Sequence, residues 1–415
     1  MIDFIEFNLD NGLHCILHKD TVNPIVNITV GYRVGSRDEL PGKKGVAHLF
    51  EHLMFQGSAN VKKGDHFDFI QRAGGNCNAF TNQDMTVYYE NLPSNHLETG
   101  LWLESDRMNS IDLSEENILN QKNVVIQEKM QNYDNAPYGT SFINILKNVM
   151  KGSSYEVATI GFEDDIRSFL KSEAEDFHFK YYSPANASLL ISGDIDYSEC
   201  EKLLNKYFGS IKKGGPVNRL FTEPEIMKSD IRQVVNDNIT LPVMYICFPI
   251  PEAGSNEDYT LEYFTSILAN NRSSRLYKNL VYDRKLIKEI HASKYQLQHS
   301  GVFLFTVVAY PGGELNIIEK EIFSEVNYFV KNGIKEEEYT KIRNKLDYGF
   351  NLRLYTMQNI CRDLFEHWFY FNDAERINNE IDRYMNVKKE DVIDSVRKYL
   401  TDAPKLFLTY LPKEN

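Results

Sequence analysis

Residues 45–57 read GVAHLFEHLMFQG, an apolar run interrupted by His48, Glu51 and His52. The turn-like residues before it and the spacing of its apolar side chains predict a helix. In a helix, side chains four residues apart share a face, and the side chain three residues along lies beside them. The two imidazoles therefore converge, with the Glu51 carboxylate next to them. Such a helix either buries its histidines with ordinary hydrogen-bond partners or presents three polar groups to a metal.

The metal interpretation has a definite chemistry. Two imidazoles and one carboxylate suit zinc, and they leave a fourth position for water. Zinc lowers the pKa of bound water from about 15.7 to about 7, and a neighbouring glutamate can then take the proton. The pattern H-x-x-E-H is the inverted form of H-E-x-x-H and is typical of inverzincins. The third ligand has to come from elsewhere in the chain.

The bulk composition narrows the class of protein. A length of 415 residues predicts two to three domains, and the net charge of −13 argues against nucleic acid or an anionic membrane as a partner. The five cysteines have no C-x-x-C spacing and fit reduced thiols. No run approaches the roughly 18–20 apolar residues of a membrane span, and no secretory signal is visible. We expect a cytoplasmic chain without a membrane partner, unless a signal was removed.

Strand and helix patterns alternate along the first half. Residues 5–17 read as a hairpin with the turn DNG, and residues 24–36 read as a further strand. Residues 64–75 predict a helix closed by glycine, and residues 76–93 are strand-like. Amphipathic helices are predicted at 96–109 and 114–132. Strands mixed with helices indicate an α+β fold.

The second half repeats this order. Residues 241–259 parallel residues 23–41, residues 332–350 parallel residues 109–127, and residues 397–412 parallel residues 179–194. Three matches in one order, offset by about 215 residues, indicate a duplicated domain. We predict two tandem homologous α+β domains, each a mixed, mostly antiparallel sheet with helices packed on one face. The expected boundaries are 1–210 and 231–415, joined by a linker at 211–230.

Four motifs resemble the pitrilysin/insulinase family of zinc peptidases. They are LDNGL at 9–13, VGSRDE at 34–39, NAFTNQDMTVYY at 78–89 and QKNVVIQEKMQ at 121–131. The similarity is greatest to the short-chain branch, which includes mitochondrial processing peptidase and bacterial paired peptidases. It implies one zinc ion per chain, bound by His48, His52 and Glu128, which lies 76 residues beyond His52. It also implies that Glu51 is the general base.

The resemblance also concerns residues around the metal ligands and the strand that would bind substrate. Gln121 stands where the family usually has a supporting glutamate, so the ligand environment is expected to differ there. The strand after Gly74 and Gly75 would be a sheet edge if no other strand pairs with it, and a peptide can add itself to such an edge. The family binds substrate in this way. The candidate substrate-binding residues are therefore Asn78, Ala79 and Phe80.

The second half lacks these groups. Aligned on the repeat, His48, Glu51 and His52 correspond to Glu262, Thr265 and Ser266. The family also supplies an Arg and a Tyr from its second half, which hold the substrate and stabilise the tetrahedral intermediate. Here those two positions are Val281 and Lys288.

An intact metal motif without the Arg/Tyr pair resembles the metal-bearing subunit of the heterodimeric members. The expected function is zinc-dependent cleavage of short or unfolded peptides, with a homologous partner subunit supplying Arg and Tyr. Two alternatives stay open. One is a self-sufficient homodimeric peptidase that uses Lys288 or another cation. The other is a non-catalytic scaffold subunit, although such subunits generally have damaged H-x-x-E-H motifs.

Overall fold

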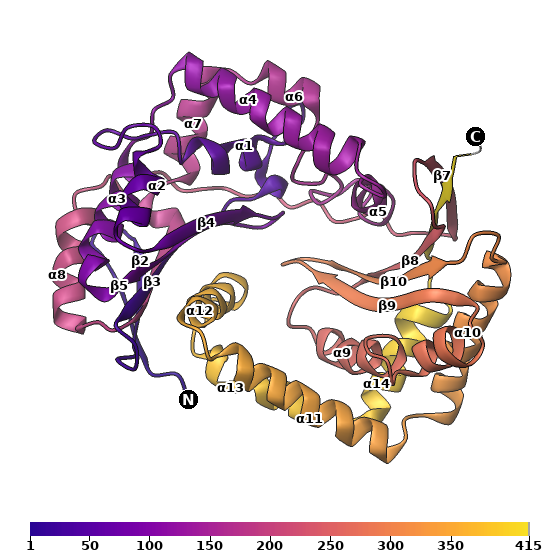
Figure 1. Cartoon of the computed structure of the whole chain (residues 1–415). Coiled ribbons are helices and arrows are strands. Elements are labelled where there is room, and N and C mark those ends of the chain that lie inside the picture. The colour runs from indigo at the N-terminus through magenta and orange to yellow at the C-terminus, as the bar shows by residue number, and fades with distance from the viewer. Residues whose placement is uncertain (414–415) are drawn as a thin grey trace. The chain divides into compact units, whose positions relative to one another are not determined.

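A computed structural model describes residues 1–413 and contains a first sheet built from the N-terminal half (Figure 1). Its strands lie in the order β1 (Phe4–Asn8), β2 (His14–Lys19), β6 (Ala187–Gly193), β3 (Ile25–Tyr32), β5 (Thr86–Pro93) and β4 (Asn76–Thr81). Only β2 and β6 run parallel; the other neighbours are antiparallel. The strand β4 lies at one edge, so its outer side has no strand partner among the described residues.

The second sheet repeats the first. Its order is β7 (Ile231–Asp237), β11 (Leu406–Pro412), β8 (Val243–Ile250), β10 (Gly301–Ala309) and β9 (Ile287–Gln296). This is the order β2-β6-β3-β5-β4 with each strand replaced by its counterpart. The pair β7 and β11 is parallel, as β2 and β6 are. The predicted duplicated α+β fold is thus confirmed.

The helices of the first half are α1 (Val46–Leu53), α2 (Asp65–Arg72), α3 (Leu97–Asn109), α4 (Glu115–Lys129), α5 (Ser141–Val149), α6 (Glu163–Ser168), α7 (Lys171–Tyr181) and α8 (Tyr197–Phe208). Those of the second half are α9 (Asn256–Leu268), α10 (Leu315–Asn332), α11 (Glu336–Arg353), α12 (Met357–Phe371), α13 (Arg376–Met385) and α14 (Lys389–Val396). The helix predicted at 114–132 ends earlier, because α4 passes into a π-helical turn at Met130–Asp134. The strand-like segment 76–93 is two strands, since residues 82–85 form a turn.

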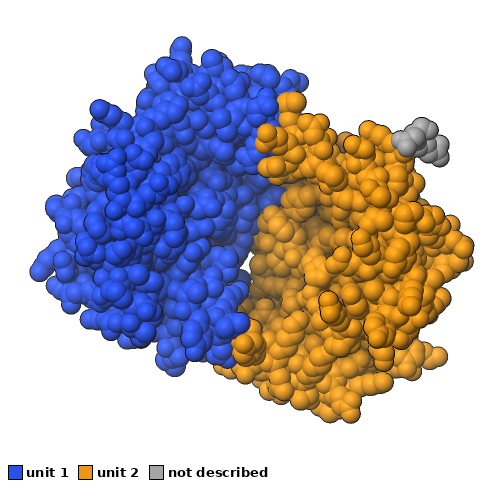
Figure 2. Space-filling view, in the orientation of Figure 1, with its two compact units in different colours: residues 1–129, 157–221, 351–379 blue, residues 130–156, 222–350, 380–415 orange. Residues whose placement is uncertain are grey.

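The chain forms two compact units that exchange segments (Figure 2). Unit 1 comprises residues 1–129, 157–221 and 351–379; unit 2 comprises residues 130–156, 222–350 and 380–415. All strands of the first sheet lie within 1–210 and all strands of the second within 231–415. The domain limits read from the sequence stay a prediction about the repeats, because the compact units are discontinuous.

Each unit contains one helix from the other half of the sequence, and the two helices, α12 and α5, pack on equivalent strands of their sheets. In unit 1, α12 packs on β3 and β6, and in unit 2, α5 packs on β8 and β11. Gly31 makes the first contact possible, because a Cβ built there would lie 2.2 Å from the ring of Phe365 on α12. The sequence predicted helices on one face of each sheet. The placement of α12 on the face opposite α3 is an addition that the sequence did not predict.

No helix among the described residues combines the length and the apolar character that crossing a membrane would require.

Candidate metal and substrate site

The helix α1 is held at its beginning by the motif VGSRDE. Gly45 precedes the helix with a φ of +100°, a conformation that favours glycine. The buried carboxylate of Glu39 accepts the backbone N–H groups of Gly45 at 3.0 Å and Ala47 at 2.7 Å. Burial raises the pKa of Glu39 to about 8. From the sequence, this glutamate was recognised only as the last residue of the motif VGSRDE. The structure shows that its carboxylate holds the first turn of α1.

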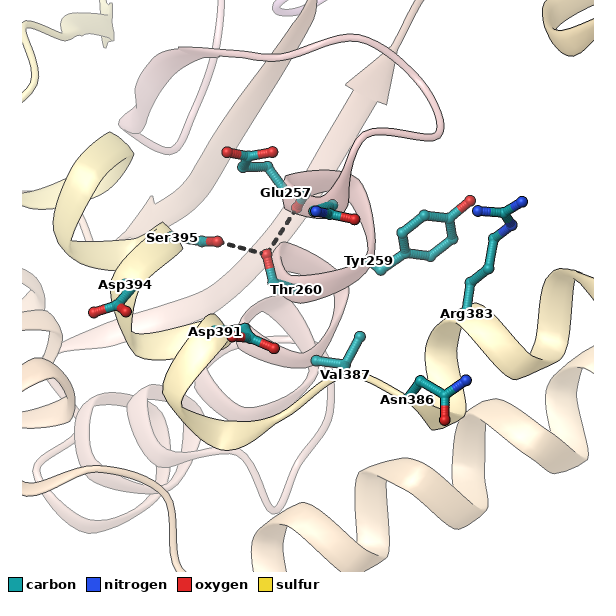
Figure 3. Close-up of a pocket in the computed structure, with 10 residues that line it drawn as sticks. Glu257, Tyr259, Thr260, Arg383, Asn386, Val387, Asp391, Asp394 and Ser395 are labelled. Atoms are coloured by element: carbon teal, nitrogen blue, oxygen red, sulfur yellow. Dashed lines mark hydrogen bonds between the residues drawn. The ribbon is translucent and has the colours of Figure 1, made fainter.

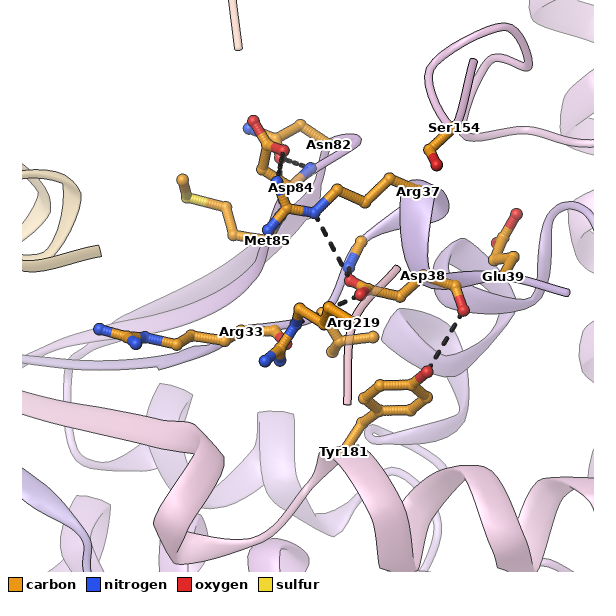
Figure 4. Close-up of polar contacts among 12 residues, drawn as sticks. Arg33, Arg37, Asp38, Glu39, Asn82, Asp84, Met85, Ser154, Tyr181 and Arg219 are labelled. Atoms are coloured by element: carbon orange, nitrogen blue, oxygen red, sulfur yellow. Dashed lines mark hydrogen bonds and ion pairs between the residues drawn. The ribbon is translucent and has the colours of Figure 1, made fainter. Parts of the chain in front are cut away.

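The same motif fixes the turn between β4 and β5 (Figure 4). The Arg37 guanidinium donates to the Asp84 carboxylate at 2.6 Å, and the backbone N–H of Arg37 donates to the carbonyl of Gln83 at 3.0 Å. Asp38 pairs with Arg219 at 3.3 Å, and the hydroxyl of Tyr181 donates to the Asp38 carbonyl. One short loop therefore sets both the metal-motif helix and the hairpin that carries β4.

The side chains of His48, His52 and Glu128 lie close together in unit 1. Glu128 Oε2 is 3.8 Å from His48 Nε2 and 3.5 Å from His52 Nε2. The two imidazole rings are nearly perpendicular, with centroids 4.9 Å apart. The apolar residues of α1 are buried, whereas His48 and His52 are partly exposed on the other side. One potential ligand atom from each of the three lies within 4.8 Å of the others, which fits a single ion.

The electrostatics of this cluster suit a cation. Burial, together with the neighbouring His52, lowers the pKa of His48 to about 4. The imidazole of His48 is therefore neutral at pH 7, the form that binds a metal. Among the described residues its buried Nδ1 has no hydrogen-bond partner, whereas its Nε2 faces Glu128.

Glu51 lies between the cluster and the edge strand. Burial raises the pKa of Glu51, while a hydrogen bond with the Thr81 side chain of β4 acts in the opposite direction. A carboxylate in this environment is a stronger base than an exposed one, which suits a general base. Its position beside His52 was expected from the helix spacing.

The strand β4 presents the three candidate substrate-binding residues. Asn78 is exposed, whereas Ala79 and Phe80 are half-buried. Phe80 packs against a cluster that includes Phe365 of α12. The backbone N–H of Ala79 donates to its neighbour's side-chain oxygen, Asn78 Oδ1, at 2.9 Å. This N–H is therefore available to an added strand once the Asn78 side chain moves.

Gln121 is buried on α4, seven residues before Glu128 and so on the same side of the helix. Its influence on the ligands stays a prediction.

The positions expected to carry Arg and Tyr lie in unit 2. Val281 lies in a π-helical turn and packs on the core of that unit. Lys288 is exposed on β9. The nearby Arg284 pairs with Glu321 at 2.6 Å, and Tyr282 is exposed. Neither position offers a guanidinium or a phenol.

In the repeat of α1, the helix α9, an ion pair replaces the histidines. The ammonium of Lys294 on β9 lies 2.7 Å from Asp258 Oδ1 and 3.2 Å from Glu262 Oε2. Thr265 and Ser266 are buried. The sequence alignment placed Glu262 opposite His48 but gave no signal for the lysine, which comes from a different strand.

A polar cavity of about 470 Å³ lies in unit 2, between α9 and the segment from α13 to α14 (Figure 3). Thr260 donates to Ser395 at 2.7 Å in its wall, and Glu257 pairs with Lys398 at 3.5 Å.

The structure contains a second group of side chains of the kinds that bind metals, which the sequence did not predict. His66, Glu90 and Glu104 are fully buried in unit 1, with candidate ligand atoms within 4.8 Å of one another. Each comes from a different element, and none has a neighbour at helical ligand spacing. Only the three-dimensional structure brings them together.

Two family models match the chain. The insulinase peptidases (peptidase family M16) match residues 14–161, which include the whole His48, His52 and Glu128 cluster, and the peptidase M16 inactive domain matches residues 169–346. Among relatives, the zinc protease PqqE of Helicobacter pylori is 28% identical over 400 residues, covering 95% of this chain and 90% of PqqE. The uncharacterized zinc protease YmxG of Bacillus subtilis is 24% identical over 357 residues, 84% of each chain.

Solved structures with a similar fold include bacterial proteases. The crystal structure of a protease from Helicobacter pylori gives a TM-score of 0.90 at 26% identity, covering 99% of this chain and 100% of that one. The periplasmic protease PqqL of Escherichia coli gives 0.83 at 17% identity, covering 100% of this chain but 48% of PqqL, and shows likeness of fold alone. The sequence motifs, the duplicated fold and the family matches together place this chain in the pitrilysin/insulinase family of peptidases (family M16).

Proposed function

We propose that the chain is the metal-bearing subunit of a zinc-dependent endopeptidase. The observation that carries the proposal is the approach of His48, His52 and Glu128 to within ligand distance of one another, with Glu51 beside them and an unpaired strand edge next to Glu51. Family membership supports a peptidase, and the relatives named zinc proteases support zinc as the metal.

The residues have distinct tasks in this proposal. His48 and His52 offer imidazole nitrogens and Glu128 offers one carboxylate oxygen, the donor set that suits catalytic zinc. When bound, zinc supplies a Lewis acid that lowers the pKa of water to about 7. Glu51 holds the proton taken from the attacking water on its carboxylate and delivers it to the leaving amine. Thr81 orients that carboxylate through its side-chain hydrogen bond.

The proposed class of substrate follows from the position of β4 at the edge of its sheet. An added peptide must be extended to pair with the strand edge, which favours short or unfolded peptides over folded proteins. Main-chain hydrogen bonds to the edge, including the Ala79 N–H, hold the peptide. Asn78 and Phe80 lie two residues apart and therefore contribute side-chain contacts on the same face of the strand.

The proposal includes a second chain. Val281 and Lys288 supply neither the Arg nor the Tyr of the family pattern, and removing an oxyanion donor typically costs about 10²–10³ in rate. A homologous partner carrying that pair would complete the site. PqqL, in which the matched region is 48% of the chain, is a fold relative of about twice this length and supports the idea of a larger working unit.

The test compares the chain alone with the chain mixed with a homologous subunit that carries Arg and Tyr. We expect peptide cleavage only from the mixture. Strong cleavage by the lone chain would instead support the homodimeric alternative with Lys288, and zinc binding without cleavage by any pairing would support the scaffold alternative.

Glu51→Gln tests the mechanism itself. This variant should keep its zinc and lose turnover, because the amide cannot accept the proton. Undiminished cleavage would remove Glu51 from the mechanism.

A further inference from the structure

A second cluster of ligand-type side chains lies in the interior of unit 1. His66 comes from α2, Glu90 from β5 and Glu104 from α3. The side chains of the two glutamates are 0% exposed and that of His66 is 5% exposed. His66 Nε2 lies 2.9 Å from Glu90 Oε1, and one atom from each of the three residues lies within 4.8 Å of the others. This separation suits ligands of one ion.

The cluster contains polar atoms without a hydrogen-bond partner. Both carboxylate oxygens of Glu90 and Nε2 of His66 are buried and make no hydrogen bond of normal geometry in the described part of the chain. The short contact between His66 and Glu90 thus lacks hydrogen-bond geometry. Glu90 lies close enough to Glu104 for a hydrogen bond only when one of the two carboxyls is protonated. Buried polar atoms are normally paired, and an unpaired carboxylate in an apolar interior costs several kcal/mol. Three unpaired atoms on two side chains that approach to 2.9 Å indicate a missing partner.

The local charge also lacks a cation. Glu104 is paired with Arg107, whose Nε donates to Glu104 Oε2 at 2.9 Å. Among the described residues Glu90 has no such ion pair, so two carboxylates face one guanidinium and one of them needs a proton or a second cation. Burial raises the pKa of both glutamates to about 7, and burial together with Arg107 lowers the pKa of His66 to about 3. His66 is therefore a neutral imidazole with a free lone pair.

A proton on Glu90 would balance the charge, but one hydrogen bond pairs at most two of the three atoms, Glu90 Oε1 and His66 Nε2, and leaves Glu90 Oε2 without a partner. A metal ion accepts lone pairs from His66 and from both carboxylates at once. Glu104 can give one oxygen to the ion while the other stays bonded to Arg107, an arrangement in which an outer partner orients a ligand. One imidazole with two carboxylates suits zinc or another divalent transition metal better than calcium or magnesium.

We propose that His66, Glu90 and Glu104 bind a second divalent metal ion, separate from the His48, His52 and Glu128 site. The ion ties together α2, β5 and α3. Its surroundings are closed to solvent, which is the pattern of a structural site and not of a catalytic one. Cys77 of β4 lies opposite Glu90 in the strand pairing, so the ion would also support the strand that we propose binds substrate.

Measuring the metal content of a variant that lacks the first site distinguishes the two proposed metal sites. The variant His48→Ala/His52→Ala leaves the buried cluster untouched and changes only partly exposed positions. After dialysis against a weak chelator, elemental analysis should give two metal equivalents per wild-type chain and one per variant chain. A variant without metal would overturn the proposal.

Location is tested by adding Glu90→Gln to that double variant, which should remove the remaining equivalent. Retention of this equivalent would overturn the assignment. If the triple variant does not fold, anomalous diffraction from wild-type crystals at the metal edge replaces it, with a peak expected between His66 and Glu90. Absence of that peak contradicts the proposal.

The outcome does not depend on the proposed peptidase function. A chain in which His48→Ala/His52→Ala changes no metal content but Glu90→Gln does would keep the buried site and contradict the catalytic one.

Discussion

The carboxylate of Glu39 accepts the backbone N–H of Ala47 at 2.7 Å, one residue before His48. This bond ties the start of α1 to a buried acid, so the orientation of the metal-motif helix depends on a side chain that is no ligand. Glu39→Ala leaves the N–H groups of Gly45 and Ala47 buried and unpaired. We expect a loss of about 1–3 kcal/mol in the free energy of unfolding. Zinc affinity should fall about tenfold or more, as for other residues that support ligands.

The measurement is chemical denaturation together with zinc competition. Glu163→Ala is the control, because Glu163 is a partly exposed acid at the start of α6 that forms a surface pair with Arg167. It should cost under about 1 kcal/mol. Equal zinc affinity in the wild type and in Glu39→Ala would show that α1 keeps its position without this bond.

Metal removal should abolish cleavage by the assembled enzyme. A chelator takes the ion from His48, His52 and Glu128, and added zinc should restore activity. Glu128→Gln replaces an anionic ligand by a neutral one, so it should need much more zinc for half-maximal activity. Glu116→Gln changes an exposed acid at the start of the same helix and should behave as the wild type. Activity that resists full zinc depletion would contradict the assignment.

The outward N–H of Ala79 makes a specific prediction for substrate binding. Ala79→Pro removes this donor, so a peptide added to the β4 edge loses one main-chain hydrogen bond. We expect KM to rise about 5- to 10-fold, the equivalent of about 1 kcal/mol, with a smaller change in kcat. Ala79→Ser keeps the N–H and should leave KM close to the wild-type value. Equal KM for the Pro and Ser variants would exclude edge pairing at this position.

Local patterns explain how much of the site the sequence predicted. His48 and His52 converge because four residues make about one helical turn, and this rule needs no tertiary information. Glu128 was named through family resemblance, since spacing along the chain cannot place a side chain from a different helix. The duplicated sheets followed from three repeated segments, each recognisable by itself.

What the sequence missed depends on contacts between distant segments. Nothing near Gly31 indicates that Phe365 of α12 will pack on it, so the exchange of α5 and α12 was invisible. The buried glutamates at 90 and 104 lie in segments that read as ordinary amphipathic elements, and charge is normally a sign of exposure. Both failures arise because burial is a property of the folded chain.

The contact between Gly31 and Phe365 is testable by a double-mutant cycle. Gly31→Ala places a methyl group where the ring lies, and such overpacking typically costs about 1–3 kcal/mol. Phe365→Ala alone leaves a cavity and costs about 3–5 kcal/mol. Together they should cost less than their sum, because the small side chain at position 365 makes room for the methyl group added at position 31. Denaturant unfolding of the four proteins gives the coupling; strict additivity would mean that α12 does not pack on β3.

Lys294 should stabilise unit 2 over a defined pH range. Burial acts against its charge, but Asp258 and Glu262 outweigh this effect and raise the pKa of Lys294. Burial also acts against the charge of Asp258, yet the ammonium brings the pKa of Asp258 below its ordinary value. The raised lysine pKa makes the contribution present below about pH 10 and lost above it. The lowered aspartate pKa makes it present above about pH 4 and lost as the pH falls. The stabilisation is therefore constant from about pH 5 to pH 9.

Lys294→Met leaves two carboxylates without their buried cation and should cost about 3–5 kcal/mol at pH 7. The cost should shrink as the pH drops below about 4, where protonated carboxyls no longer need the ammonium. Lys288→Met is the matched control, because Lys288 is exposed on the same strand. Its substitution should change the free energy of unfolding by under about 0.5 kcal/mol at either pH. A cost for Lys294→Met that equals the control, or that stays the same at low pH, would show that the ion pair does not hold α9 to β9.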